Sequence, residues 1–194
     1  MKSGRSKEKG SSFEREVGRQ LSRWVSKDAR SDLFTRNVLS GGDFTRRSKT
    51  TSSELGMPGD LMARHPLAFQ FAQTFMVECK HYKELGLASF IFDRTGSSFL
   101  SKTLAYAQLQ ASQASQHYMV VAKQNYVPTL LFVGKRVGER IRYMTRHPSN
   151  LTFHIIHDRY FVTHLSCLLD LVEPEPFIRD CKDALQIRRR SRKT

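Results

Sequence analysis

The run Thr129 to Gly134, Thr-Leu-Leu-Phe-Val-Gly, is the feature that most constrains how this chain can fold. It is continuous and apolar, and it has the length of a strand that is buried on both faces. Such a strand needs secondary structure above and below it, because otherwise one of its faces would meet water. The run therefore predicts a sheet that helices cover on both sides.

Two long helices are predicted to provide that cover. In the first, which begins at Ser11 as its N-cap, apolar residues recur at spacings of three and four and form one stripe. They are Phe13, Val17, Leu21, Trp24 and Val25. The second helix is predicted from about Leu100 to Gln124, because the same step continues to Tyr118 and Val121.

Shorter elements complete the expected order. Strands are predicted at 61–63 and 75–80, on either side of a turn at His65-Pro66. A hairpin of 152–156 and 160–163 follows, and a last short helix covers 165–172. The segment 32–54 is predicted to be irregular. The order indicates an α/β fold with a mixed sheet and helices on both of its faces.

The charge of the chain points to a polyanionic partner. Lys and Arg number 32 against 18 Asp and Glu, which gives a formal net charge of +14. Nucleic acid is the first expectation and an acidic membrane surface the second. No apolar stretch approaches the roughly 18 residues of a bilayer span, and the first ten residues do not resemble a signal peptide. Three widely spaced cysteines favour a reducing, cytoplasmic compartment.

Part of this charge lies at the two ends of the chain. We expect a basic flexible tail at 1–10, a single folded domain at 11–181 and a second basic flexible tail at 182–194. Solvated ends and direct contact with phosphates both remain open as roles for the tails.

Two short motifs carry the chemistry. Gly59-Asp60 begins one predicted strand, and Glu78-Cys79-Lys80 ends the next. Glu78 and Lys80 project to the same side of a strand, while Cys79 points the other way. If the two strands pair, Asp60 can converge with Glu78, and two close carboxylates repel unless a cation sits between them. Mg²⁺ or Mn²⁺ suits such oxygen ligands, and a neighbouring lysine can orient the attacking water, as in phosphodiester hydrolysis.

An alternative interpretation of these motifs is purely structural. A bare Glu-x-Lys occurs by chance about once in a chain of this length. Glu78 and Lys80 could form a surface ion pair, and Asp60 could be a turn residue. Asp180-Cys181-Lys182 fits the same pattern, but it follows two prolines and has no second acid on a preceding strand.

The run Lys9 to Glu16, Lys-Gly-Ser-Ser-Phe-Glu-Arg-Glu, adds a third element in the expected order. Together with the two motifs it resembles the PD-(D/E)xK nucleases, and most closely the Holliday junction resolvase branch, whose members are often phage-encoded. The resemblance covers roughly residues 9 to 136. It implies a restriction-endonuclease-like fold and a Mg²⁺-dependent deoxyribonuclease in which Mn²⁺ can substitute. It also implies branched DNA as substrate, a role in recombination and a homodimer.

The resemblance assigns a role to each matching residue. Asp60 and Glu78 would bind the metal, the Cys79 backbone carbonyl would be a further ligand, and Lys80 would be the catalytic lysine. Glu14 would complete the site from the first helix. A competing interpretation makes Ser11 and Glu14 a capping box, in which the carboxylate folds back onto the helix start. Glu16 is the substitute if Glu14 is not part of the site.

Basic residues outside the motifs are candidates for DNA contact. Arg36, Arg46, Arg47 and Lys49 flank the Gly41-Gly42 loop, and Lys135-Arg136 follows the buried strand. An ordinary solvated loop explains the first group equally well.

Three other functions remain as alternatives. A RecB-type exonuclease would carry Gln-x-x-x-Tyr on the helix after the lysine, whereas Gln113 and Tyr118 are one residue too far apart. A restriction-type endonuclease is the second alternative. A basic DNA-binding protein without catalytic activity is the third, and it would need no divalent ion.

Overall fold

A five-stranded mixed sheet forms the centre of the computed structural model, which describes residues 3–37, 58–93, 95–145, 154–156 and 159–191. The strand order is β3-β4-β5-β7-β6, in which β3 and β4 are parallel and the other neighbours antiparallel. The strands are β3 (Phe75–Tyr82), β4 (His117–Gln124), β5 (Leu130–Gly134), β7 (Tyr160–His164) and β6 (His154–Ile156). A separate antiparallel pair joins β1 (Phe34–Arg36) to β2 (Leu61–Ala63).

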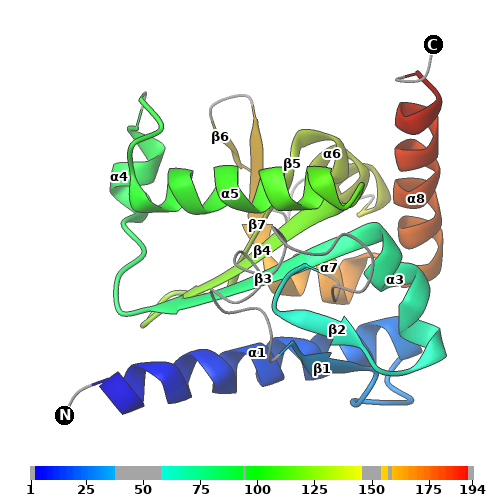
Figure 1. Ribbon diagram of the computed structural model, residues 1–194, viewed down its shortest axis with the longest axis horizontal. Helices are drawn as coiled ribbons and strands as arrows, with labels where there is room; N and C mark the ends of the chain where they lie inside the picture. Colours follow the sequence, from blue (N-terminus) through cyan, green and yellow to red (C-terminus); the bar gives the residue numbers. More distant parts are fainter. Residues whose placement is uncertain (1–2, 38–57, 94, 146–153, 157–158, 192–194) are drawn as a thin grey trace, which may run out of the picture.

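Helices cover both faces of this sheet (Figure 1), as the sequence predicts. On one face α5 (Phe99–Gln113) and α4 (Leu87–Ile91) pack on alternate residues of the strands, among them Met76, Val120 and Phe132. On the other face α1 (Ser3–Ser26) packs on the residues between them, such as Val77 and Val121. The remaining helices contribute to this second core. They are η1 (Pro66–Ala68), α3 (Phe69–Thr74), α6 (Lys135–Met144), α7 (Leu165–Leu171) and α8 (Pro174–Ser191).

The predicted helix from Leu100 to Gln124 is wrong in its second half. Helix α5 ends at Gln113, and Ser115 follows with a φ of 56°, a left-handed conformation that stops the helix. The residues from His117 to Ala122 are all buried, because β4 lies inside the sheet and meets a core on each face. The spacing of Tyr118 and Val121 matches that of a helix only by coincidence. These residues form a strand because both faces of the chain are buried here.

Most other predicted elements are confirmed. Strands β2, β3 and β5 lie where they were expected, and β6 and β7 form the closing hairpin over their described residues. The segment expected to be irregular contains β1, and its residues 38–54 lie outside the described ranges. The turn at His65-Pro66 opens into η1 and α3.

Helices also reach into both segments that are predicted as tails. Helix α1 already begins at Ser3, so Ser11 is not its N-cap. Helix α7 is not the last one, because α8 begins at Pro174, where proline fits the first turn of a helix, and continues to Ser191. Leu185 on α8 is buried. The division into one domain and two tails stays a prediction. Within the described ranges no helix is long and apolar enough to cross a membrane.

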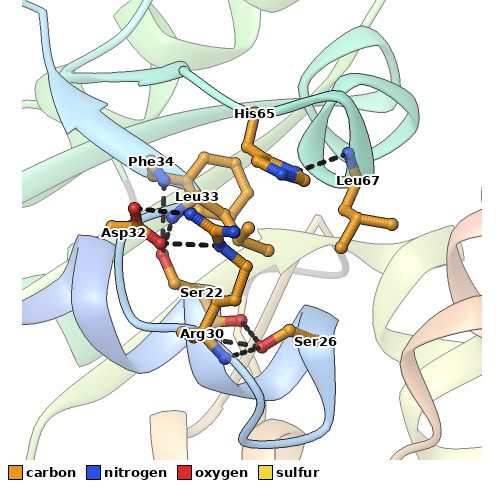
Figure 2. Close-up of polar contacts among 8 residues, drawn as sticks. All are labelled: Ser22, Ser26, Arg30, Asp32, Leu33, Phe34, His65 and Leu67. Carbon is orange, nitrogen blue, oxygen red and sulfur yellow. Dashed lines mark hydrogen bonds and ion pairs between the residues drawn. The ribbon is translucent and has the colours of Figure 1, made fainter.

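The Ser22 side chain links helix α1 to the start of β1 through hydrogen bonds, as Figure 2 shows. Its hydroxyl donates to the Gly18 carbonyl at 2.7 Å and accepts the backbone N–H groups of Leu33 at 3.0 Å and Phe34 at 3.2 Å. The side chain is fully buried, so water cannot replace these bonds. Ser22 therefore fixes the start of the strand that carries Arg36 and leads to Asn37.

We expect Ser22→Ala to lower the free energy of unfolding by about 2 kcal/mol or more, because it leaves two buried N–H groups without their acceptor. Ser26→Ala is the matched control. The Ser26 hydroxyl accepts the Arg30 N–H at 2.9 Å in an exposed turn, where water can take its place, so we expect a loss below about 1 kcal/mol. Urea unfolding measures both. Equal losses in the two variants would contradict the role of Ser22.

Candidate active site

The site lies on β3, which is one of the two edge strands of the main sheet as described. Glu78 and Lys80 project to one face, and their side chains form an ion pair. Cys79 points to the opposite face, where it is buried in the core with α1. This alternation confirms the prediction from the Glu-x-Lys spacing.

Asp60 reaches these residues by a route that differs from the expected one. Strand β2 pairs with β1 and not with β3. Instead, the residue before β2 is bonded directly to the free edge of β3. The Asp60 N–H donates to the Val77 carbonyl at 2.7 Å, and the Asp60 carboxylate accepts the Cys79 N–H at 2.8 Å. These two bonds hold the carboxylate next to Glu78 and Lys80.

Gly59 is required for this close approach. Its φ is +99°, a conformation that residues with a side chain rarely adopt. A Cβ atom at this position would lie 2.7 Å from the Val77 carbonyl oxygen, which is backbone and cannot move aside easily. A glycine directly before the acid therefore lets the loop lie flat against β3.

Asn37 holds the other side of the same loop, a role that no sequence motif indicates. Its backbone N–H donates to the Asp60 carbonyl at 2.8 Å, and its Nδ2 donates to the Gly59 carbonyl at 2.9 Å. The residue is only 2% exposed. One asparagine next to a Ser- and Thr-rich segment looks like any loop residue, and only the fold brings it beside Gly59.

Lys80 is close to both acids. In addition to its pair with Glu78, its Nζ lies 4.0 Å from Oδ2 of Asp60. Burial and the charge of Asp60 raise the pKa of Glu78, and Lys80 offsets only part of this effect. Burial alone would lower the pKa of Lys80, but the charges of Glu78 and Asp60 outweigh it and raise the pKa of the ammonium. Lys80 is therefore a cation at neutral pH.

Glu14 joins the site through Arg36. The two side chains form an ion pair between α1 and β1, and Glu14 makes no capping box, because α1 starts well before Ser11. Burial raises the pKa of Glu14 even though Arg36 donates a hydrogen bond to it. Glu16, the possible substitute, pairs with Lys123 at 3.3 Å and is not held by Arg36.

The donor atoms at this edge suit a hard divalent ion. In an extended strand the N–H and C=O of one residue face the same edge, so the Cys79 carbonyl faces the edge at which its N–H meets Asp60. Within the described residues no three Asp, Glu, His or Cys side chains form a complete ligand group. Mg²⁺ does not need one, since it typically takes one or two carboxylates together with water and substrate phosphate. Asp60 and Glu78 with the Cys79 carbonyl fit this pattern.

The other candidate residues are not part of this cluster. Lys135 and Arg136 lie at the start of α6, near the N-terminal end of β4. Asp180 of the second Asp-x-Lys lies on α8 and pairs with Arg140 at 3.5 Å, away from the acids on β3. Arg46, Arg47 and Lys49 lie outside the described residues.

Comparison with known proteins gives one family. A family model described as "Phage putative PDDEXK endonuclease" matches residues 5–178. The match spans Glu14, Asp60, Glu78 and Lys80, and it covers most of the chain. Neither the curated proteins nor the solved structures give a significant match.

We expect Gly59→Ala to destabilise the protein by about 2 kcal/mol or more, because a positive φ and a clash with backbone act together. Gly96→Ala is the matched control. Gly96 has a φ of +72° but nothing within 4 Å of the added Cβ, so only the conformational cost of about 1 kcal/mol applies. Thermal unfolding measures both variants. If Gly59→Ala lowers the stability no more than Gly96→Ala does, the close backbone contact between Gly59 and β3 is contradicted.

The raised pKa of Glu78 predicts a specific pH dependence in metal-free buffer. Above about pH 4.3, where an ordinary Glu ionises, the native state still binds a proton that the unfolded chain has lost, so Glu78 costs stability as the pH rises. Glu78→Gln removes this cost. The melting temperature of the variant relative to wild type should therefore increase with pH through this window and then level off. A difference that stays constant with pH would contradict the shift.

Proposed function

The chain belongs to this phage PDDEXK endonuclease family and is therefore a nuclease, and we propose that it hydrolyses DNA phosphodiester bonds with a divalent metal ion at Asp60, Glu78 and Lys80. One observation carries the proposal. The loop before β2 brings the Asp60 carboxylate to the edge of β3, next to the Glu78 and Lys80 pair, with Nζ of Lys80 4.0 Å from Oδ2 of Asp60. A surface ion pair would need only Glu78 and Lys80.

Asp60 and Glu78 would hold the ion, together with the Cys79 carbonyl. A bound Mg²⁺ or Mn²⁺ would act as a Lewis acid on the phosphate and lower the pKa of a coordinated water. The raised pKa of Glu78 supports this assignment, because a cation next to buried, mutually repelling carboxylates stabilises their charged forms. Glu14, which Arg36 keeps in place, is the candidate for a further ligand or for binding a metal-bound water.

Lys80 would act by its charge. In hydrolysis, the attacking water loses a proton to the solvent as its oxygen bonds to phosphorus, the bond from phosphorus to the leaving sugar oxygen breaks, and that oxygen takes up a proton. Lys80 is protonated at neutral pH, so it is suited to orient the water and to offset negative charge that builds up on the phosphate oxygens. Its present contacts with Glu78 and Asp60 do not support a role as the general base.

The finer substrate assignment rests on the resemblance to the junction resolvases. Branched DNA such as a Holliday junction is the proposed substrate, with recombination as the process. A homodimer is proposed because a junction is resolved by cuts in two strands. The RecB-type alternative has less support, since Gln113 ends helix α5 whereas Tyr118 lies on β4, so the two do not share one helix.

The nearest rival from another class is a basic DNA-binding protein without catalysis. A nicking assay on supercoiled plasmid and on a four-way junction, with Mg²⁺, Mn²⁺ or EDTA, separates the two. We expect cleavage only with a divalent ion and faster cleavage of the junction. Binding without cleavage under any of these conditions would support the rival, and cleavage of linear ends alone would support an exonuclease.

We expect Lys80→Ala to reduce cleavage below detection while DNA affinity stays close to that of wild type, because one charge is a small share of a binding energy that is spread over many phosphates. Lys123→Ala is the matched control, since Lys123 is also part-buried and paired with a glutamate, but outside the cluster. It should retain cleavage. Plasmid nicking and fluorescence anisotropy measure the two quantities. Substantial cleavage by Lys80→Ala would remove this lysine from the mechanism.

A further inference from the structure

A basic hollow lies at the start of helix α6. Its volume is about 350 Å³, and it opens between the C-terminal part of α5, the first residues of β4 and the junction of β5 with α6. The backbone N–H of Lys135 donates to the Arg159 carbonyl at 3.3 Å, which joins the starts of α6 and β7 at this place. The hollow is lined by Gln108, Ser112, Gln116, Lys135, Arg136 and Arg159, among others.

Among the residues that the structure describes, no acidic side chain balances the charge of this hollow. Lys135, Arg136 and Arg159 contribute three cations, and the lining has no acidic residue. None of the three makes an ion pair with an acid within the described ranges. Gln108 and Ser112 add neutral groups that can donate hydrogen bonds to an anion. The first turn of α6 also has N–H groups that no carbonyl within the helix accepts, and it lies at the positive end of the helix dipole.

The hollow lies at the opposite end of β3 and β4 from the active site, but on the same face of the sheet. Tyr118, which lines it, is paired with Met76 and packs in the same core, and Glu78 and Lys80 follow on the same side of β3. Lys80 is paired with Ala122, four residues beyond Tyr118. At about 3.3 Å per residue this is roughly 13 Å along the strands, a distance that corresponds to about four base pairs along the axis of a duplex.

We propose that this hollow binds a backbone phosphate of the DNA substrate, several nucleotides away from the phosphate that is cleaved. The proposal rests on the proposed function for the identity of the ligand, and the cavity, its three cations and its donors supply the argument for an anion. The contact would position the DNA without reading its sequence. It would also add Arg159 to Lys135 and Arg136, which the sequence already makes candidates for DNA contact.

The test removes two of the cations and compares the salt dependence of DNA binding. The variant is Lys135→Ala with Arg159→Ala, and the control is Lys102→Ala with Arg23→Ala, which removes the same charges from exposed positions on α5 and α1. Affinity for a duplex of roughly 20 base pairs is measured in EDTA by fluorescence anisotropy at several NaCl concentrations. Losing one phosphate contact should reduce the slope of log affinity against log salt by about 0.9. The control should keep the slope of wild type.

A second pair of variants adds a negative charge without removing any lining cation. Gln108→Glu places a carboxylate in the hollow, and Gln113→Glu places one outside it on the same helix. Gln108→Glu should weaken DNA binding several-fold at low salt and little at high salt, whereas Gln113→Glu should have a smaller effect. Melting temperatures close to wild type show that the variants are folded.

A phosphate group in the hollow could belong to DNA or to free inorganic phosphate. Calorimetric titration of the protein with inorganic phosphate distinguishes the two. If the double variant Lys135→Ala with Arg159→Ala no longer binds free phosphate but keeps the wild-type salt slope for DNA, the hollow is a small-anion site and the proposal is overturned. An unchanged slope with no phosphate binding overturns it as well. Plasmid nicking by wild type tests the proposed function separately. A reduced slope in a protein that never nicks DNA would retain the DNA contact and refute the nuclease proposal.

Discussion

The site depends on the pair of hydrogen bonds that holds Asp60 against the free edge of β3. One runs from the Asp60 N–H to the Val77 carbonyl and the other from the Cys79 N–H to the Asp60 carboxylate. They can form only because β3 is an edge strand and because Gly59 lets the backbone approach without a side chain. Asn37 closes the loop from the side of β1. The carboxylate is thus positioned by backbone geometry, and its place does not depend on the charges around it.

The cluster has more acidic than basic side chains. Glu14, Asp60 and Glu78 contribute three carboxylates, whereas Arg36 and Lys80 contribute two cations. Burial raises the pKa of both glutamates, so the protein holds them in surroundings that favour their neutral forms. A structural ion-pair network would gain nothing from this arrangement. A site that recruits a divalent cation and a phosphate gains from it, because the ion stabilises the carboxylates when it arrives.

The sequence predicts correctly those features that depend only on the spacing of residues within one helix or strand. The apolar run of β5 and the spacing of Glu78 and Lys80 needed only the period of a strand, and both predictions are confirmed. Strand β4 was mistaken for helix because a strand that is buried on both faces has no alternation, so Tyr118 could continue the helical step. The part played by Asn37 could not be predicted, since it depends on the place of β1 beside the Asp60 loop. The capping box at Glu14 failed because α1 begins earlier than Ser11.

We propose that Asp60 and Glu78 together hold a catalytic metal ion. Anomalous diffraction from crystals soaked in Mn²⁺ tests it most directly. We expect an anomalous peak within about 2.2 Å of a carboxylate oxygen of each residue, because a Mn–oxygen bond is close in length to a Mg–oxygen bond. The peak should be absent in crystals of Asp60→Asn that retain the wild-type fold. A peak bound to other residues, or no peak at a Mn²⁺ concentration that supports cleavage, would contradict it.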